Sequence, residues 1–173
     1  MKRRYICLNF IFVLSLFLTV MSCKSKDEKP PYQLDNNNTA AISIPYEEMG
    51  GVKMIPVKLN GITMNMIYDT GCSGIHLSLN EVQTLVKNGK LTENDILVGD
   101  YSRIADGSIV QMGKINIKEI VIGNGDNVLV LHDRPASVTL NQVAPILLGN
   151  EVLDELASVE VDNVEKTIKF YKK

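Results

Sequence analysis

Asp69, Thr70 and Gly71 are the residues of this sequence with the clearest capacity for chemistry, and they follow an apolar run that ends at Tyr68. A strand that delivers a carboxylate into a tight turn presents a general acid or base to any reacting group within hydrogen-bond reach. Gly71 lets another backbone or a ligand approach closely, and the Thr70 hydroxyl can brace the turn. Because Asp-Thr-Gly tripeptides also occur by chance in surface loops, the interpretation depends on the elements around them.

The residues before this turn have the pattern of a β-hairpin. Apolar and polar residues alternate over residues 57–59 and again over residues 62–66, with Asn60 and Gly61 between the two runs. Asn-Gly at this place favours a type I′ turn, because both central residues of that turn need a positive φ. Pro56 cannot donate to a strand ladder, which predicts an edge position or a bulge there. The second strand of the hairpin would deliver the aspartate.

A helix is expected soon after the Asp-Thr-Gly turn. Ser78 and Glu81 have the spacing of a capping box, Leu85 continues an apolar face, and Gly89 is a natural C-terminal stop. A second, short helix is expected near Thr92. The sequence therefore predicts one clear helix and one short one.

Strand patterns return in the second half of the chain. Isoleucines alternate with polar residues over residues 115–122, but their phase reverses near Glu119, which predicts a bulge or a bend. Residues 128–131 are apolar on both faces and predict a central strand. A last alternation at residues 167–170 follows an expected turn at residues 162–163. The coarse prediction is one mainly β, barrel-like domain with one or two short helices.

Composition bounds the class of protein. The chain has 173 residues, of which 45% are hydrophobic and 22% charged, with a formal net charge of −2. This is enough for one domain with a core, and it excludes a disordered chain. This net charge argues against a nucleic-acid surface, and the absence of Trp argues against a platform on which bases stack.

The Asp-Thr-Gly turn after an Asn-Gly hairpin resembles the catalytic turn of the retropepsin-like aspartic peptidases of clan AA. The run Ile146-Leu147-Leu148-Gly149 is similar to the second signature of that family, two apolar residues and a glycine. The resemblance covers residues 42–173, with the elements in the expected order. It implies a single-lobe, closed β-barrel in which the second signature passes behind the catalytic turn, supports it and precedes a helix at residues 150–156.

The same resemblance implies a substrate-binding flap. Ala105, Asp106, Gly107 and Ser108 lie between strand-like runs, where the family places the flap that closes over substrate. It also implies that residues 159–170 form the closing strand pair of the domain.

The family resemblance implies a specific mechanism for Asp69, Thr70 and Gly71. In such enzymes two aspartates face each other across a two-fold axis and share one proton, because like charges so close cannot both ionise. The ionised member takes a proton from the water that attacks the peptide carbonyl, and the protonated member polarises that carbonyl. Thr70 would bond across the axis. The implied substrate is a polypeptide, and no cofactor is implied.

This chain carries a single Asp-Thr-Gly and is too short for the two lobes of a self-sufficient enzyme. The second Asp69 must therefore come from an identical chain, which predicts a C2 homodimer.

Two residues depart from the usual family pattern. Cys72 stands where small residues such as Ala or Ser are commoner, so it is either a buried, inert packing thiol or a redox-sensitive group beside the turn. Tyr68 stands where aliphatic residues are commoner, so its hydroxyl needs a partner or an exit to solvent. The two histidines, His76 and His132, have no cysteine pair beside them, and we predict no metal site.

The N-terminus has the pattern of an export signal. Lys2, Arg3 and Arg4 precede a short apolar stretch, which favours a signal peptide over a membrane-spanning helix. Ser22 before Cys23 resembles the lipobox of bacterial lipoproteins, in which the cysteine is acylated; the alternative is a plain cleaved signal. We therefore expect a signal peptide at residues 1–22, a flexible tether at 23–40 and a peptidase domain at 41–173.

Export and lipidation together predict where the mature protein is found in the cell. Removing 22 of the 173 residues leaves 151, with Cys72 as a lone thiol and no pair to form a disulfide. The mature protein would lie on the periplasmic or outer-membrane face. Lys26, Asp27 and Glu28 resemble a signal that sends some lipoproteins to the cell surface.

The leading hypothesis is an aspartic endopeptidase. The alternative is a non-catalytic lipoprotein whose dimeric barrel binds extended peptides by strand addition, and a purely structural envelope lipoprotein is a third, weaker idea.

Overall fold

The computed structural model describes residues 42–125 and 127–173. They belong to one compact unit that spans Asn36–Lys173, and the other unit, Met1–Asp35, lies outside the described residues. The expected signal peptide at residues 1–22, the lipidation site Cys23 and the tether at residues 23–40 also lie outside the described residues.

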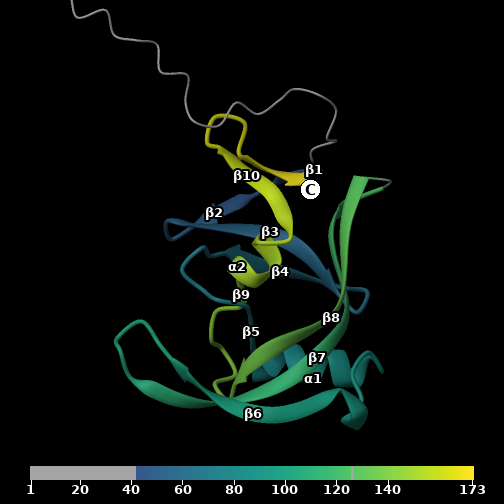
Figure 1. Cartoon of the computed structure of the whole chain (residues 1–173), viewed down its shortest axis with the longest axis vertical. Coiled ribbons are helices and arrows are strands. Elements are labelled where there is room, and N and C mark those ends of the chain that lie inside the picture. Colours follow the sequence, from purple (N-terminus) through teal and green to yellow (C-terminus); the bar gives the residue numbers. More distant parts are fainter. Residues whose placement is uncertain (1–41, 126) are drawn as a thin grey trace, which may run out of the picture. The chain divides into compact units, whose positions relative to one another are not determined.

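Strands dominate the described residues and form two sheets (Figure 1). The smaller, antiparallel sheet has the order β1 (Ile42–Pro45), β11 (Thr167–Lys172), β10 (Leu156–Asp162). The larger sheet has the order β2 (Glu47–Met49), β3 (Val52–Leu59), β4 (Ile62–Tyr68), β9 (Leu147–Leu148), β5 (Ile75–Ser78), β8 (Asn127–Thr139), β7 (Ile109–Asn124), β6 (Ile96–Arg103). The helical segments are α1 (Leu79–Lys87), the 3₁₀ helix η1 (Glu93–Asp95) and α2 (Asn150–Leu153).

The larger sheet closes on itself. β3 pairs with β4 along one edge and with β7 along the other, so β3-β4-β9-β5-β8-β7 form a ring. This arrangement confirms the expected mainly β, closed fold with short helices. β9 lies between β4 and β5, parallel to the first and antiparallel to the second.

The β3–β4 hairpin forms as predicted. Asn60 and Gly61 both have positive φ, 48° and 86°, as a type I′ turn requires. The Asn60 side chain also ties the turn to distant segments, since its Nδ2 donates to the Lys90 carbonyl at 2.8 Å and its Oδ1 accepts the Glu119 N–H at 3.0 Å.

Pro56 occupies a local edge of β3. On the side away from β4, β3 pairs with β2 through residues 52–54 and with β7 through residues 57–59. Pro56 falls in the interval between these two partners, where a missing N–H costs no ladder bond.

The phase reversal near Glu119 is a bend that needs no inserted residue. Ile117 and Ile120 are both buried, while Lys118 and Glu119 between them are exposed. The register of β7 against β8 is the same on both sides, although the Lys118–Asp133 pair is skipped and Asp133 has a φ of 50°. Before the bend β7 pairs with β6, and after it β7 pairs with β3.

The prediction of a central strand at residues 128–131 is wrong. β8 pairs with β5 only through residues 136–139, so residues 128–131 have β7 as their one strand partner among the described strands. The side chain of Val130 is accordingly 39% exposed. The cause is length, because β8 starts at Asn127 and the short strand β5 joins it only from Ala136 onward.

Both predicted helical segments after β5 are present. Ser78 caps α1 in a capping box with Glu81, and the helix ends at Lys87 with Asn88 as its C-cap. Gly89 follows with a φ of 66°, and the Gly89 and Lys90 N–H groups donate to the Val86 and Leu85 carbonyls. Thr92 caps the short helix η1. α2 ends at Leu153, earlier than the expected residue 156, because Leu156 already belongs to β10.

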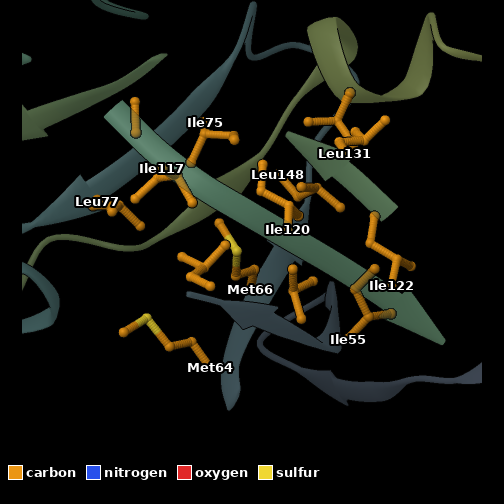
Figure 2. Packing of buried hydrophobic residues seen from close by; sticks show 14 of the residues in the cluster. Ile55, Met64, Met66, Ile75, Leu77, Ile117, Ile120, Ile122, Leu131 and Leu148 are labelled. Atoms are coloured by element: carbon orange, nitrogen blue, oxygen red, sulfur yellow. The ribbon is translucent and has the colours of Figure 1, made fainter. Parts of the chain in front are cut away.

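Isoleucine, leucine and methionine side chains from all the ring strands fill the core (Figure 2). Figure 2 shows Leu148 of β9 among them, near Ile120 of β7. No helix in the described part of the chain is long and apolar enough to cross a bilayer.

Candidate active site

Asp69 lies immediately after β4, at the start of a tight turn. The Gly71 N–H donates to Asp69 Oδ1 at 2.8 Å, and the Cys72 N–H donates to the Asp69 carbonyl at 3.3 Å. The Asp69 N–H in turn donates to the Leu148 carbonyl of β9 at 3.1 Å. Backbone groups on both sides therefore fix the aspartate, while its carboxylate remains partly exposed.

The segment from Leu148 onward packs directly behind this turn. The Asn150 N–H donates to the Cys72 carbonyl at 2.9 Å, and the Glu151 N–H donates to the Ser73 carbonyl at 2.8 Å. A Cβ on Gly149 would overlap the carbonyl oxygens of Cys72 and Gly74. Only glycine fits at this position, because the two backbones approach too closely for a side chain. The structure thus brings Leu147, Leu148 and Gly149 against the Asp-Thr-Gly turn.

Asn150 is a further residue of the site that the sequence analysis missed. Its Nδ2 donates to the Thr70 carbonyl at 2.7 Å, so it holds the turn from the first residue of α2. A polar residue directly after the second signature is the only signal in the sequence that points to it. The Thr70 residue itself is exposed. Its expected bond across a dimer axis concerns a second copy of the chain and stays a prediction.

Asp69 opens into a hollow of about 570 Å³. That volume lies within the usual range for small-molecule and cofactor pockets. Its walls come from the β2–β3 turn and the start of β3, the end of β4, the segment before and including β9, and the end of β10 with the turn after it. The lining residues are Gly51, Val52, Lys53, Ile67, Tyr68, Asp69, Pro145, Leu147, Val161 and Asn163.

Burial perturbs two ionisable groups beside Asp69. It raises the pKa of the Tyr68 phenol, which lines the hollow. It also raises the pKa of the Cys72 thiol, and the nearby Asp69 carboxylate acts in the same direction, whereas a hydrogen bond to the Gly74 carbonyl opposes them. That bond runs from Cys72 Sγ at 3.2 Å. This environment favours the neutral thiol.

The two histidines lie in different surroundings. Burial lowers the pKa of His76, and His132 Nδ1 lies 3.3 Å from the Lys118 carbonyl. Within residues 42–125 and 127–173, no group of three potential ligands is placed to hold a metal ion.

The four expected flap residues form the turn of the β6–β7 hairpin. Ala105, Asp106, Gly107 and Ser108 are all exposed, and Figure 1 shows this end of the hairpin projecting away from the neighbouring strands. Hydrogen bonds from Ser108 to the Asp106 carboxylate lower the pKa of that carboxyl group. Arg103 braces the turn through the Gly107 carbonyl at 3.0 Å. No hydrogen bond within the described residues joins this turn to Asp69, so its flap role stays a prediction.

Comparison with known proteins agrees with this geometry. Residues 55–152 match the family model described as "Aspartyl protease", and this range contains both signatures. The fold is similar to the crystal structure of a retropepsin-like aspartic protease from Rickettsia conorii, with a TM-score of 0.53 and 18% sequence identity over 77% of this chain and 90% of that one. No curated protein matches the chain. Since the family match covers more than half of the residues, the chain belongs to the aspartyl protease family, and its fold is retropepsin-like.

Proposed function

We propose that this protein is an aspartic endopeptidase that hydrolyses peptide bonds as a homodimer. The observation that carries the proposal is the position of Asp69, which the Gly71 N–H and the β9 backbone orient at the edge of a hollow of about 570 Å³. Oδ1 accepts the Gly71 N–H, and no described residue bonds Oδ2, which stays available to a water molecule. Membership of the aspartyl protease family supports the same chemistry.

The proposed reaction needs two carboxyl groups. One Asp69 takes a proton from water as that water attacks the peptide carbonyl, and the protonated Asp69 of a second copy polarises the carbonyl oxygen. Because the chain holds one Asp-Thr-Gly, the proposal requires a C2 dimer that brings two Asp69 side chains together. Asn150 holds the turn on each side and would keep the pair in place.

Asp69→Asn tests the proposal with the smallest change of shape. We expect wild-type protein to cleave members of a peptide library between acidic and neutral pH, and the variant to lose about a thousandfold or more in kcat/KM. Asp133→Asn is the matched control, since Asp133 is exposed, accepts a hydrogen bond from Asn116 that an amide oxygen can also accept, and adopts a positive φ that Asn tolerates. Failure of the wild-type dimer to cleave any peptide would refute the enzymatic proposal.

Mixed dimers test the shared site directly. When wild-type chains and Asp69→Asn chains pair at random in equal amounts, about one quarter of the dimers keep both aspartates. We therefore expect about a quarter of the wild-type activity per dimer, whereas chains that act independently would retain about half. Mass spectrometry of differently tagged chains confirms that pairing is random.

A peptide-binding protein without catalysis is the alternative. If wild-type and Asp69→Asn proteins bind the same extended peptides with equal affinity and neither cleaves them, the dimeric barrel serves recognition by strand addition and not hydrolysis.

We further propose that Cys23 carries a lipid and anchors the protein outside the cytoplasm, after removal of residues 1–22. The support is the pattern of basic residues, apolar run and Ser22-Cys23 in the sequence. Cys23→Ala should move the protein from the membrane fraction to the soluble fraction and abolish the acyl mass on the N-terminal peptide. A cleaved, unacylated N-terminus in the wild type would favour the plain signal peptide.

A further inference from the structure

Lys53 is a charged residue on the core-facing row of β3. Side chains alternate between the two faces of a strand, and Ile55, Val57 and Leu59 on the same row are all fully buried. Lys53 continues this row at the start of the strand, where it is partly buried and lines the hollow that contains Asp69. The burial of a charge without a partner is costly. A cation on a core-facing row is therefore expected to have a partner or a function.

The carboxylate opposite Lys53 is already engaged. Glu48 is the β2 partner of Lys53 in the register, but its Oε2 accepts an ion pair from Lys166 at 2.7 Å. None of the ion pairs formed by the described residues includes Lys53. Its ammonium instead lies 5.3 Å from the centre of the Tyr46 ring, a cation–π contact. Lys166 is the main cause of the lowered pKa of Glu48, and Lys53 adds to it only from beyond ion-pair distance.

The ring that positions Lys53 is itself held firmly. Tyr46 is buried, and its hydroxyl donates to Asn163 Oδ1 at 3.1 Å. Asn163 is also part of the wall of the hollow. Lys166 contacts the same ring, at 5.6 Å from its centre. The Lys53 ammonium is therefore held by contacts with Tyr46, which lies between β1 and β2 and is itself tied to the β10–β11 turn.

The remaining walls of the hollow are mostly apolar. Val52, Ile67, Leu147 and Val161 line it together with Lys53 and Asp69. A ligand that complements such a surface has an apolar stem and an anionic end. Among the side chains of a polypeptide, glutamate has this form, with two methylene groups before its carboxylate.

We propose that Lys53 is a specificity-determining residue that selects polypeptide substrates with a glutamate beside the scissile bond. The glutamate methylenes lie against the apolar walls, and its carboxylate pairs with the Lys53 ammonium above Tyr46. Lys53 is partly buried and has no ion pair among the described residues. Its pairing with a substrate carboxylate is therefore more favourable than an exposed ion pair. The inference rests on the proposed peptidase function and names the substrate class of the same site.

Matched peptides that differ only in Glu, Gln or Lys at each position around the scissile bond test the proposal. At one position we expect wild-type protein to prefer Glu over Gln by about tenfold in kcat/KM. Lys53→Met should reduce this ratio to about one, Lys53→Arg should retain it, and Lys53→Glu should shift the preference to Lys. Lys58→Met is the matched control, since Lys58 is exposed on the opposite face of the same strand, and it should leave the ratio unchanged. An unchanged ratio in Lys53→Met, or no preference in the wild type, overturns the proposal.

A binding arm separates this inference from the proposed function. In the Asp69→Asn background, the Glu peptide should bind about tenfold more tightly than the Gln peptide, and Lys53→Met should abolish the difference. This difference in binding does not depend on cleavage. If it is observed and no peptide is cleaved, only the peptidase proposal is refuted. Conversely, cleavage without any preference for Glu would refute only the inference about Lys53.

A second copy of the chain is the other source of a carboxylate for Lys53. Sedimentation of Lys53→Met over a concentration series measures the strength of the dimer and so distinguishes a carboxylate of the second copy from one of the substrate. A weakened dimer with an unchanged Glu-to-Gln ratio would assign the cation to the interface between copies and overturn the proposal, whereas an unchanged dimer with a lost ratio supports it.

Discussion

Among the glycines of the candidate site, Gly149 has the least room for a side chain. Gly149→Ala would push a Cβ into the carbonyl oxygens of Cys72 and Gly74, and both belong to backbone that cannot move without displacing the Asp69 turn. We expect a loss of about 2 kcal/mol in the free energy of unfolding, measured by urea denaturation, together with a loss of peptidase activity.

Gly113→Ala is the control for Gly149→Ala. A Cβ at Gly113 would meet Val138 at 3.5 Å, an ordinary contact distance, so we expect a change within about 0.5 kcal/mol. Equal losses in both variants would show that the close approach behind the turn has no special cost.

Cys72 is expected to be an unreactive thiol. Burial and the neighbouring Asp69 carboxylate raise its pKa, so the reactive thiolate is scarcer at neutral pH than in a free cysteine. Iodoacetamide should therefore modify Cys72 more slowly in the native protein than in urea, as followed by mass spectrometry of the peptide that contains it. Cys72→Ala should retain most of the activity. Fast native alkylation with loss of activity would support the redox-sensitive alternative.

At the scale of elements, the Asp95 carboxylate links η1 to Lys118 of β7. Asp95 is almost fully buried and accepts hydrogen bonds from the Thr92 N–H and hydroxyl, both at 2.8 Å. It also pairs with Lys118 at 2.9 Å. Lys118 and then Thr92 lower the pKa of the Asp95 carboxyl group, so these partners stabilise the folded state through its ionised form.

The lowered pKa sets the direction of a pH dependence. The contribution of Asp95 to the free energy of unfolding is complete above the unfolded pKa of about 3.9 and disappears as the pH falls through the lower folded value. We expect Asp95→Asn to be less stable than wild type at neutral pH and the difference to shrink below pH 4, in urea titrations at a series of pH values. Lys118→Met should produce part of the same change, because Lys118 is the largest cause of the lowered pKa of Asp95. A constant difference at all pH values would contradict this account.

The elements also show which signals in a sequence are reliable. The Asn60-Gly61 hairpin and the capping box of α1 were predictable, because the groups that determine them lie within a few residues of each other. The position of residues 128–131 was not predictable, since an apolar run does not reveal that β5 joins β8 only from Ala136 onward. Strand neighbours are set by partners far away in the chain.

At the scale of the whole molecule, the proposal implies that activity depends on concentration. If each active site takes one Asp69 from each of two chains, specific activity should be constant while dimers prevail and fall roughly in proportion to chain concentration once they dissociate. Enzyme dilution series, compared with sedimentation under the same conditions, measure both quantities.

Two copies joined by a flexible linker provide the control for dilution. The linked protein should keep its specific activity at concentrations where the unlinked chains lose theirs, because the linker maintains a high effective concentration of the second copy. Activity of unlinked chains that persists among monomers would contradict the shared site.

The sequence by itself determined the local elements and the family. The Asp-Thr-Gly turn, the Leu147-Leu148-Gly149 signature and the hairpin between residues 52 and 68 depend on short-range backbone chemistry, and they are legible without a structure. They also sufficed to name the residues that the fold brings together behind Asp69.

Only the tertiary structure decided how distant residues complete the site. The bond from Asn150 to Thr70 spans 80 positions of the chain. Among the described residues Lys53 has no ion pair, because Glu48 pairs with Lys166, which lies 118 positions further along. No local pattern encodes such choices, since each depends on which side chains compete for the same partner once the strands have closed into a ring. Turn chemistry acts over a few residues, whereas packing and charge pairing act through space.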